Sequence, residues 1–176
     1  VLFRVAHSGT ITMLDIGTGA VTKEVSLVNT QTARPGAAPA QRVFESPLID
    51  LATGALYVID RSGPRLRRYT AKLEPQGQWP IGGQPIDLCF DARLRRVWAL
   101  STAPRRSERT RTAVDCTSGK VAGSLNVLVD EADPPRHVAC GPDGELYLAG
   151  KWLRRLATNG GTAWMVELPG EACGVH

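Results

Sequence analysis

The sequence has no uninterrupted apolar run long enough to cross a bilayer. A transmembrane helix needs roughly 18 or more consecutive apolar residues, whereas charged or polar residues interrupt every apolar stretch of this 176-residue chain. A charged start followed by an apolar core, which is the pattern of a secretory signal peptide, is absent as well. The sequence therefore predicts no membrane span and no targeting signal within the chain, and it indicates no particular compartment.

The sequence also lacks the apolar period of about 3.6 residues that marks an amphipathic helix. Its 18 glycines and 12 prolines separate short stretches that are alternating or continuously apolar, which is the pattern of strands joined by tight turns. The composition, 43% hydrophobic and 22% charged, is that of a globular chain rather than a disordered one. We therefore expect an all-β chain with many turns.

Lysine is scarce, so the net charge of +4 comes almost entirely from arginine. An arginine excess can indicate a nucleic-acid or acidic partner. A GC-rich coding bias would produce the same excess, and this is the simpler explanation. The only lysines are Lys23, Lys72, Lys120 and Lys151.

The cysteines carry no metal signature, because no two of them have the short C-x₂₋₄-C spacing of a structural zinc site. Most of them follow a proline by a few residues within an expected inner strand. That position predicts small buried side chains, the usual environment of a free cysteine. Disulfides are the alternative in a secreted protein. The four are Cys89, Cys116, Cys140 and Cys173, and all but Cys116 follow a proline.

Common enzyme motifs are missing too. The sequence contains no G-x-S-x-G nucleophile elbow. It also contains no P-loop or dinucleotide-binding fingerprint, because its glycines are spread through turns rather than clustered before a helix. The motifs therefore give no positive indication of catalysis.

What the sequence does contain is a degenerate internal repeat. Three segments share the order proline, apolar strand, polar turn and aromatic strand, and Tyr57, Trp98 and Tyr147 occupy matching places in them. A second signature is an Asp four residues before a Gly, in which the carboxylate accepts amide hydrogens of a turn and the Gly adopts a positive φ. Each such turn predicts a hairpin. The segments are residues 46–60, 84–101 and 134–150, and the turns are Asp15–Gly19, Asp50–Gly54 and Asp115–Gly119.

The repeating unit is close to the ~40–45 residues of a four-stranded propeller blade. Radial packing of such blades protects the strand edges, so that many short strands can stay soluble without helices. We therefore predict a single β-propeller domain or propeller segment of four-stranded antiparallel meanders, with about four blades. The approximate units are residues 1–30, 43–80, 81–128 and 133–168, with residues 169–176 as a closing strand.

Two stretches carry a family resemblance. "PLIDLATGALYVIDRSGPRLRRY" (residues 47–69) and "PPRHVACGPDGELYLAGKWLRRL" (residues 134–156) resemble NHL-type and related six-bladed propeller repeats. The repeat alignment makes Arg65–Tyr69 and Trp152–Leu156 equivalent third strands, with Leu66 and Leu153 facing the blade interior, and makes Arg93–Arg96 a turn. Because about four blades are few for this family, we expect the chain to be part of a larger propeller, with a compact four-bladed closure as the alternative.

Seven arginines crowd one predicted blade with few acidic residues nearby. If they faced the same side, they would form a cationic surface for an acidic protein or for phosphates. Turns between successive strand pairs emerge on opposite faces, which splits the group. No aromatic residue interleaves with the loop arginines, which argues against stacking of RNA bases. A solvated loop is the simplest interpretation. The seven are Arg93, Arg95, Arg96, Arg105, Arg106, Arg109 and Arg111.

The resemblance also implies two kinds of metal site in a central channel. Some NHL-like propellers are zinc lyases with histidine ligands, and calcium-dependent lactonase propellers use inward acidic and amide side chains. No acidic or tyrosine partner of the histidines stands in a recognisable motif, so we favour no metal and no cofactor. The zinc candidates are His137 and His176, and the calcium candidates are Asp50, Asp87 and Asn126.

Together these observations predict a non-enzymatic β-propeller that acts as a protein-interaction or scaffolding module. It would use the loop arginines and the Pro/Ala-rich segment at residues 29–42 to bind a protein partner. The positive charge of the arginines favours an acidic partner. A propeller hydrolase or lyase with zinc or calcium in its channel is one alternative. An NHL-like RNA-binding surface is the other.

Overall fold

The computed structural model describes residues 2–5, 10–26, 44–61, 63–103, 108–129 and 132–169, and within them it contains 15 strands and no helix. Every strand pair is antiparallel, and strands adjacent in sequence are adjacent in their sheet. The first sheet comprises β1 (Leu2–Val5), β2 (Thr10–Leu14) and β3 (Val21–Ser26). The second comprises β4 (Phe44–Asp50), β5 (Ala55–Asp60), β6 (Arg65–Tyr69) and β7 (Pro75–Pro80). The third comprises β8 (Pro85–Asp91), β9 (Arg96–Thr102), β10 (Glu108–Asp115) and β11 (Lys120–Leu128). The fourth comprises β12 (His137–Cys140), β13 (Leu146–Ala149), β14 (Trp152–Leu156) and β15 (Thr162–Glu167).

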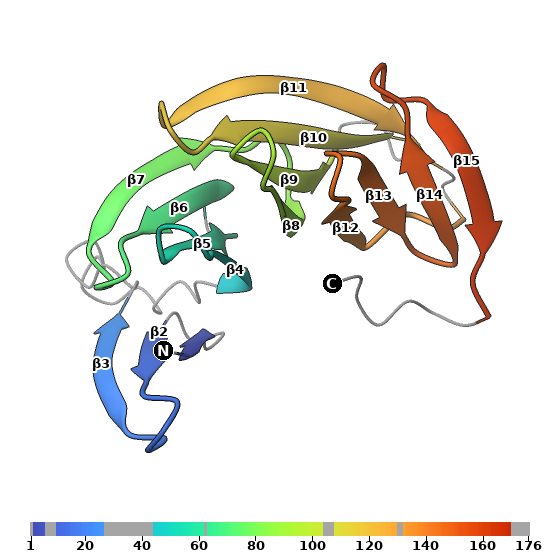
Figure 1. Cartoon of the computed structure of the whole chain (residues 1–176). Coiled ribbons are helices and arrows are strands. Elements are labelled where there is room, and N and C mark those ends of the chain that lie inside the picture. The colour runs from blue at the N-terminus through green and yellow to red at the C-terminus, as the bar shows by residue number, and fades with distance from the viewer. Residues whose placement is uncertain are drawn as a thin grey trace, which may run out of the picture.

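The four sheets stand next to one another in an arc, and each runs from an inner strand to an outer strand (Figure 1). In the three four-stranded sheets the inner strands are β4, β8 and β12, and the outer strands are β7, β11 and β15. Burial is greatest in the second strand and least in the outer strand, since every residue of β5 is buried whereas every residue of β15 is exposed. The sheets are therefore blades, and the predicted all-β architecture of four-stranded antiparallel meanders is confirmed.

The Asp-Gly signature marks two different turns. Asp50 ends an inner strand, whereas Asp15 directly follows β2 and Asp115 ends β10, and both of these strands are followed by outer strands. Thr18 N–H donates to Asp15 Oδ1 over 2.8 Å, and Ser118 N–H donates to Asp115 Oδ1 over 2.7 Å. Because β2 and β3 repeat the turn chemistry of β10 and β11, strands β1–β3 correspond to the second to fourth strands of a blade.

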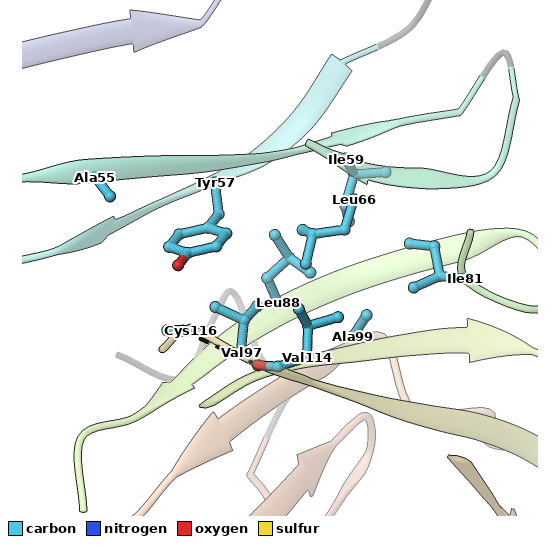
Figure 2. Close-up of a cluster of buried hydrophobic side chains, with 10 residues drawn as sticks. All are labelled: Ala55, Tyr57, Ile59, Leu66, Ile81, Leu88, Val97, Ala99, Val114 and Cys116. Carbon is cyan, nitrogen blue, oxygen red and sulfur yellow. Dashed lines mark hydrogen bonds between the residues drawn. The ribbon is translucent and has the colours of Figure 1, made fainter. Parts of the chain in front are cut away.

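The apolar core lies between neighbouring blades rather than inside one sheet. Strand β5 is buried on both faces, since Leu56 and Val58 pack against the first blade and Tyr57 and Ile59 pack against the third. Figure 2 shows the cluster between the second and third blades, where Tyr57, Ile59 and Leu66 face side chains such as Val97. Full burial of a side chain of this size contributes about 1.5–3 kcal/mol, so these contacts hold each blade against the next.

The predicted third strands are present as β6 and β14, and they differ in one side chain. Leu66 of β6 is fully buried. Its counterpart Leu153, which is also predicted to face the blade interior, is only half-buried. In β14 the residues Arg154 and Leu156 are buried, and Arg154 Nη2 lies 3.5 Å from Asp133 Oδ2. The Asp133 carboxylate also accepts the N–H groups of Lys151 and Trp152, at 2.7 and 3.1 Å.

The cysteines that the structure describes agree with the predicted core role. Cys89 and Cys116 are buried, Cys140 is half-buried, and all three are free thiols. Cys173 and the predicted closing strand at residues 169–176 lie outside the described residues except for Pro169. No helix in the described part of the chain is long and apolar enough to span a membrane.

Candidate functional site

A cleft with a volume of about 310 Å³ opens between the third and fourth blades. The β8–β9 turn forms one wall, and the β12–β13 turn, which contains Asp143 and Glu145, forms the other. Leu146 and Leu156 belong to the apolar cluster between these blades and provide an apolar part of the lining. The cleft therefore combines apolar surface with charged side chains of both signs.

Two of the seven predicted arginines line this cleft, and Arg111 is the better anchored. Its guanidinium stacks on Trp98, with 5.2 Å between the guanidinium carbon and the ring centroid. Its Nη2 also donates to the carbonyl oxygen of Thr158 in the β14–β15 connection, over 3.0 Å. Burial lowers the pKa of Arg111, because desolvation disfavours the charged form. No carboxylate of the described residues forms an ion pair with this half-buried cation.

The strand register explains why Arg111 and Trp98 meet. Arg111 lies opposite Leu100 across the β9–β10 pair, and Trp98 lies opposite Ala113. Residues directly opposite one another share a face of the sheet, and so do residues two positions apart along a strand. Trp98 and Arg111 are therefore diagonal neighbours on the face that points toward the fourth blade. No aromatic residue interleaves with the loop arginines in the sequence, and the ring beside Arg111 comes from the adjacent strand β9.

Arg93 is the second arginine of the cleft, and it is exposed. Its guanidinium extends over the β12–β13 turn: a Cβ atom added to Gly144 would lie 3.3 Å from Arg93 Nε and 3.4 Å from its Nη2. The described carboxylates form no ion pair with Arg93. The cleft thus presents two unpaired guanidinium groups from one blade.

The other predicted arginines are placed elsewhere. Arg95 is engaged with Asp50 of the preceding blade through two hydrogen bonds, and Arg96 lies opposite Asp115 in the β9–β10 register. Arg109 is half-buried, and its Nη1 donates to the backbone carbonyl of Glu108 over 2.9 Å. Burial lowers the pKa of Arg109 as well. Arg105 and Arg106 lie outside the described residues.

Asp91 lies beneath the β8–β9 wall and is fully buried. Its Oδ1 accepts the N–H of Leu94 over 2.9 Å, which closes the turn. Its Oδ2 has no hydrogen-bond partner among the described residues. A buried carboxylate oxygen without a donor carries a substantial desolvation penalty, so this atom is an unusual feature of the site that the turn motif did not reveal.

The inner edge of the same two blades carries the candidate channel residues. His137 Nδ1 lies 3.4 Å from Asp87 Oδ2, and the same oxygen accepts the N–H of Val138 over 3.0 Å. Both side chains are partly exposed, at 29% and 20%. The described residues contain no group of three or more histidine, cysteine or acidic side chains placed to hold a metal ion. His176 lies outside the described residues.

The three calcium candidates are not brought together. The Asp50 carboxylate is taken by Arg95 and by the hydroxyl of Thr53. Asn126 lies on the outer strand β11, where its Nδ2 donates to Glu108 Oε2 over 2.9 Å. Asp87 is on the inner strand β8, next to His137. These three calcium candidates therefore do not converge.

Comparisons with known proteins support the architecture. No protein-family model and no curated protein matches the chain. Among solved structures, hydrazine synthase from Kuenenia stuttgartiensis is similar over 91% of this chain and 43% of its own, with a TM-score of 0.68 and 14% identity. BamB from Moraxella catarrhalis is similar over 95% of this chain and 47% of its own, with a TM-score of 0.64 and 16% identity. A protein of unknown function from Bacteroides caccae is similar over 95% of this chain and 58% of its own, with a TM-score of 0.66 and 15% identity.

These similarities concern the fold and do not single out the NHL type. The chain spans about half the length of the solved structures that it matches. Identities of this size are too low to transfer a function, because one fold hosts many unrelated functions. The chain has a β-propeller fold built of four-stranded antiparallel blades.

Proposed function

We propose that this chain is a non-enzymatic propeller module that binds a protein partner, and that the cleft between the third and fourth blades receives an acidic segment of that partner. The observation that carries the proposal is Arg111. It is a half-buried guanidinium stacked on Trp98, it has no ion-pair partner among the described carboxylates, and it lines a cleft of about 310 Å³.

The chemistry of Arg111 favours a carboxylate as its ligand. A guanidinium presents a planar fork of donors that matches a carboxylate in a bidentate geometry. Stacking on Trp98 restricts the orientation of this fork, so less side-chain entropy is lost when a ligand binds. Arg93 of the β8–β9 turn offers a second cation in the same lining. Interfaces typically gain most of their affinity from such tryptophan and arginine residues.

The other lining side chains favour a binding role over a catalytic one. Leu94, Leu146 and Leu156 can accept apolar side chains of a bound segment. The described lining contains no serine, cysteine or histidine that could act as a nucleophile or as the usual general base. A peptide with alternating acidic and apolar residues would therefore be complementary to the cleft.

Binding of short labelled peptides, measured by fluorescence polarisation, tests the proposal. The probe is a peptide library in which aspartate and glutamate alternate with leucine, and its control contains asparagine and glutamine at the acidic positions. We expect the acidic library to bind more tightly. Arg111→Gln should weaken binding about tenfold, because a charge-assisted bidentate contact is worth about 1.4 kcal/mol or more. Arg65→Gln, an exposed arginine of the second blade, is the matched control and should leave binding unchanged.

Equal binding of the two libraries, or an equal loss in Arg111→Gln and Arg65→Gln, would overturn the proposal. The same protein samples address the alternatives. Tight binding of a single-stranded RNA pool that weakens with salt and is lost in Arg111→Gln would favour the RNA-binding surface. Stoichiometric zinc or calcium that is lost in His137→Ala would favour the hydrolase or lyase.

A further inference from the structure

The blade repeat places two buried aspartates at equivalent positions. Asp50 ends β4 and Asp91 ends β8, both are fully buried, and both cap the turn that follows them. In each case the first turn of the following blade lies next to the aspartate. This is the β8–β9 turn for Asp50 and the β12–β13 turn for Asp91. The partners of the two carboxylates can therefore be compared directly.

At the boundary between the second and third blades the carboxylate is fully paired. Arg95 of the β8–β9 turn donates to both oxygens of Asp50, and its Nη1 lies 2.8 Å from Asp50 Oδ1. Arg95 has a φ of 53°, which is the left-handed conformation that glycine adopts at the corresponding position of other turns, such as Gly54 with a φ of 68°. The turn thus places an arginine where the repeat usually places a glycine.

At the boundary between the third and fourth blades the corresponding position is Gly144, with a φ of 84°. A Cβ atom at Gly144 would lie 3.1 Å from Asp91 Oδ2, which shows that Gly144 occupies the place that Arg95 occupies one blade earlier. Glycine has no side chain to donate, and Asp91 Oδ2 is left without a hydrogen-bond partner. At this boundary the repeat therefore retains the acceptor Asp91 but has no arginine at the position that corresponds to Arg95.

The position at which the donor is absent, Gly144, lies in the lining of the cleft. Gly144 and Arg93 both line the cleft, and a Cβ atom at Gly144 would lie within 3.4 Å of both Asp91 Oδ2 and the Arg93 guanidinium. Arg93 is exposed and forms no ion pair with the described carboxylates, so its side chain can move at little cost. Gly144 and the exposed Arg93 side chain thus stand at the part of the cleft that borders Asp91.

We propose that the segment bound in the cleft inserts an arginine beside Gly144 that pairs with Asp91, as Arg95 pairs with Asp50. This inference rests on the proposed function and adds to it the residue type that the partner must carry. The inserted guanidinium supplies the donors that Asp91 Oδ2 lacks, and a buried bidentate pair is worth more than an exposed one. The partner segment then combines acidic side chains for Arg93 and Arg111 with one basic side chain for Asp91.

Two versions of one acidic peptide test this inference. The first carries a single arginine at its centre, and the second carries citrulline, which has a similar shape without the charge. We expect the arginine peptide to bind about tenfold more tightly. Asp91→Asn should remove this difference, and it retains an oxygen that can accept the N–H of Leu94. Glu74→Gln, which removes an exposed carboxylate of the second blade outside the cleft, should preserve the difference.

A second variant tests the same contact without replacing the buried Asp91 side chain. Gly144→Ala puts a methyl group 3.1 Å from Asp91 Oδ2 and should remove the preference for arginine in a chain that still melts cooperatively. Equal binding of the arginine and citrulline peptides, or a preference that persists in Asp91→Asn, would overturn the inference. Those results would leave the proposed function standing if the acidic library still binds through Arg111. Failure of that library would remove the proposed function instead.

Discussion

The buried carboxylate of Asp50 is held by the guanidinium of Arg95 from the next blade. Asp50 is 0% exposed and accepts hydrogen bonds from both Nη atoms of Arg95, while the Arg95 side chain is 33% exposed. The Arg95 guanidinium also lies over the ring of Phe90, 5.1 Å from its centroid. The positive φ of Arg95 is disfavoured for a residue with a side chain, so the ion pair and its surroundings stabilise this conformation. Arg95 therefore links the second and third blades.

Removing the guanidinium of Arg95 should destabilise the fold. We expect Arg95→Met to lower the free energy of unfolding by about 2–3 kcal/mol, because it leaves a buried carboxylate with fewer donors. The value is below that of a fully buried pair because the arginine is partly exposed. Urea denaturation of the single variants and of the double variant with Asp50→Asn gives the coupling energy. Strictly additive effects would contradict a direct pair.

The same pair makes stability depend on pH. Burial tends to raise the pKa of Asp50, but hydrogen bonds from Arg95, Thr53 and Ala52 outweigh this effect, and the pKa lies below its usual value of 3.8. A carboxyl group with a lowered pKa stabilises the fold above its unfolded-state pKa, and this contribution is lost as the pH falls through the folded-state pKa. Stability should therefore decline below about pH 4.

Thermal melts between neutral and acidic pH measure this decline. Hydrogen bonds from Thr18 and Ser118 also lower the pKa values of Asp15 and Asp115, so the three aspartates act in the same direction. Asp50→Asn should reduce the acid-dependent loss without abolishing it. A melting temperature that falls as steeply in Asp50→Asn as in the unchanged chain would contradict the assignment to Asp50.

The strand order could be predicted from the sequence because its signals are local. Proline-led inner strands, Asp-Gly turns and aromatic second strands lie within a few residues of one another, and they locate β6 and β14 correctly. The pattern did not separate the turn of Asp50 from those of Asp15 and Asp115. All three share the spacing of Asp and Gly, and only the packing of neighbouring blades buries Asp50 while leaving the other two turns at the surface.

The candidate site was less predictable because its parts come from different blades. Trp98 and Arg111 are neighbours only through the β9–β10 register, which depends on where the hairpin begins. That pairing could have been found by counting residues back from the expected turn. The pairing of Arg95 with Asp50, 45 residues apart, depends on tertiary packing. The close approach of Gly144 to Asp91 also depends on tertiary packing, because both contacts require the position of one blade relative to the next.

The central core should be sensitive to truncation at Leu66. This side chain is fully buried between the second and third blades, and replacing a buried leucine by alanine typically costs about 2–5 kcal/mol. We expect Leu66→Ala to fall in this range. Leu51→Ala is the matched control, since Leu51 is 91% exposed in the β4–β5 turn, and it should change the unfolding free energy by less than about 0.5 kcal/mol. Similar losses in the two variants would contradict the assigned core.

Two glycines with nearly the same backbone conformation should differ in their tolerance of alanine. Gly19 has a φ of 69° and Gly83 a φ of 68°, so both substitutions place a side chain in the left-handed region, which costs about 1 kcal/mol. A Cβ atom at Gly19 would have no heavy atom within 4 Å, whereas one at Gly83 would lie 1.8 Å from the backbone oxygen of Thr102.

The backbone oxygen of Thr102 cannot yield as a flexible side chain would, because Thr102 ends β9 and its N–H donates to the carbonyl of Gln84 over 2.8 Å. The loop at Gly83 must therefore move away from β9. This movement breaks the hydrogen bond between Thr102 N–H and the carbonyl of Gln84, just before β8. We expect Gly83→Ala to lower the free energy of unfolding by about 3 kcal/mol or more, against about 1 kcal/mol for Gly19→Ala. Urea denaturation measures both values. Equal losses would show that the cost comes from the backbone conformation alone and that the close approach of Gly83 to Thr102 does not exist in solution.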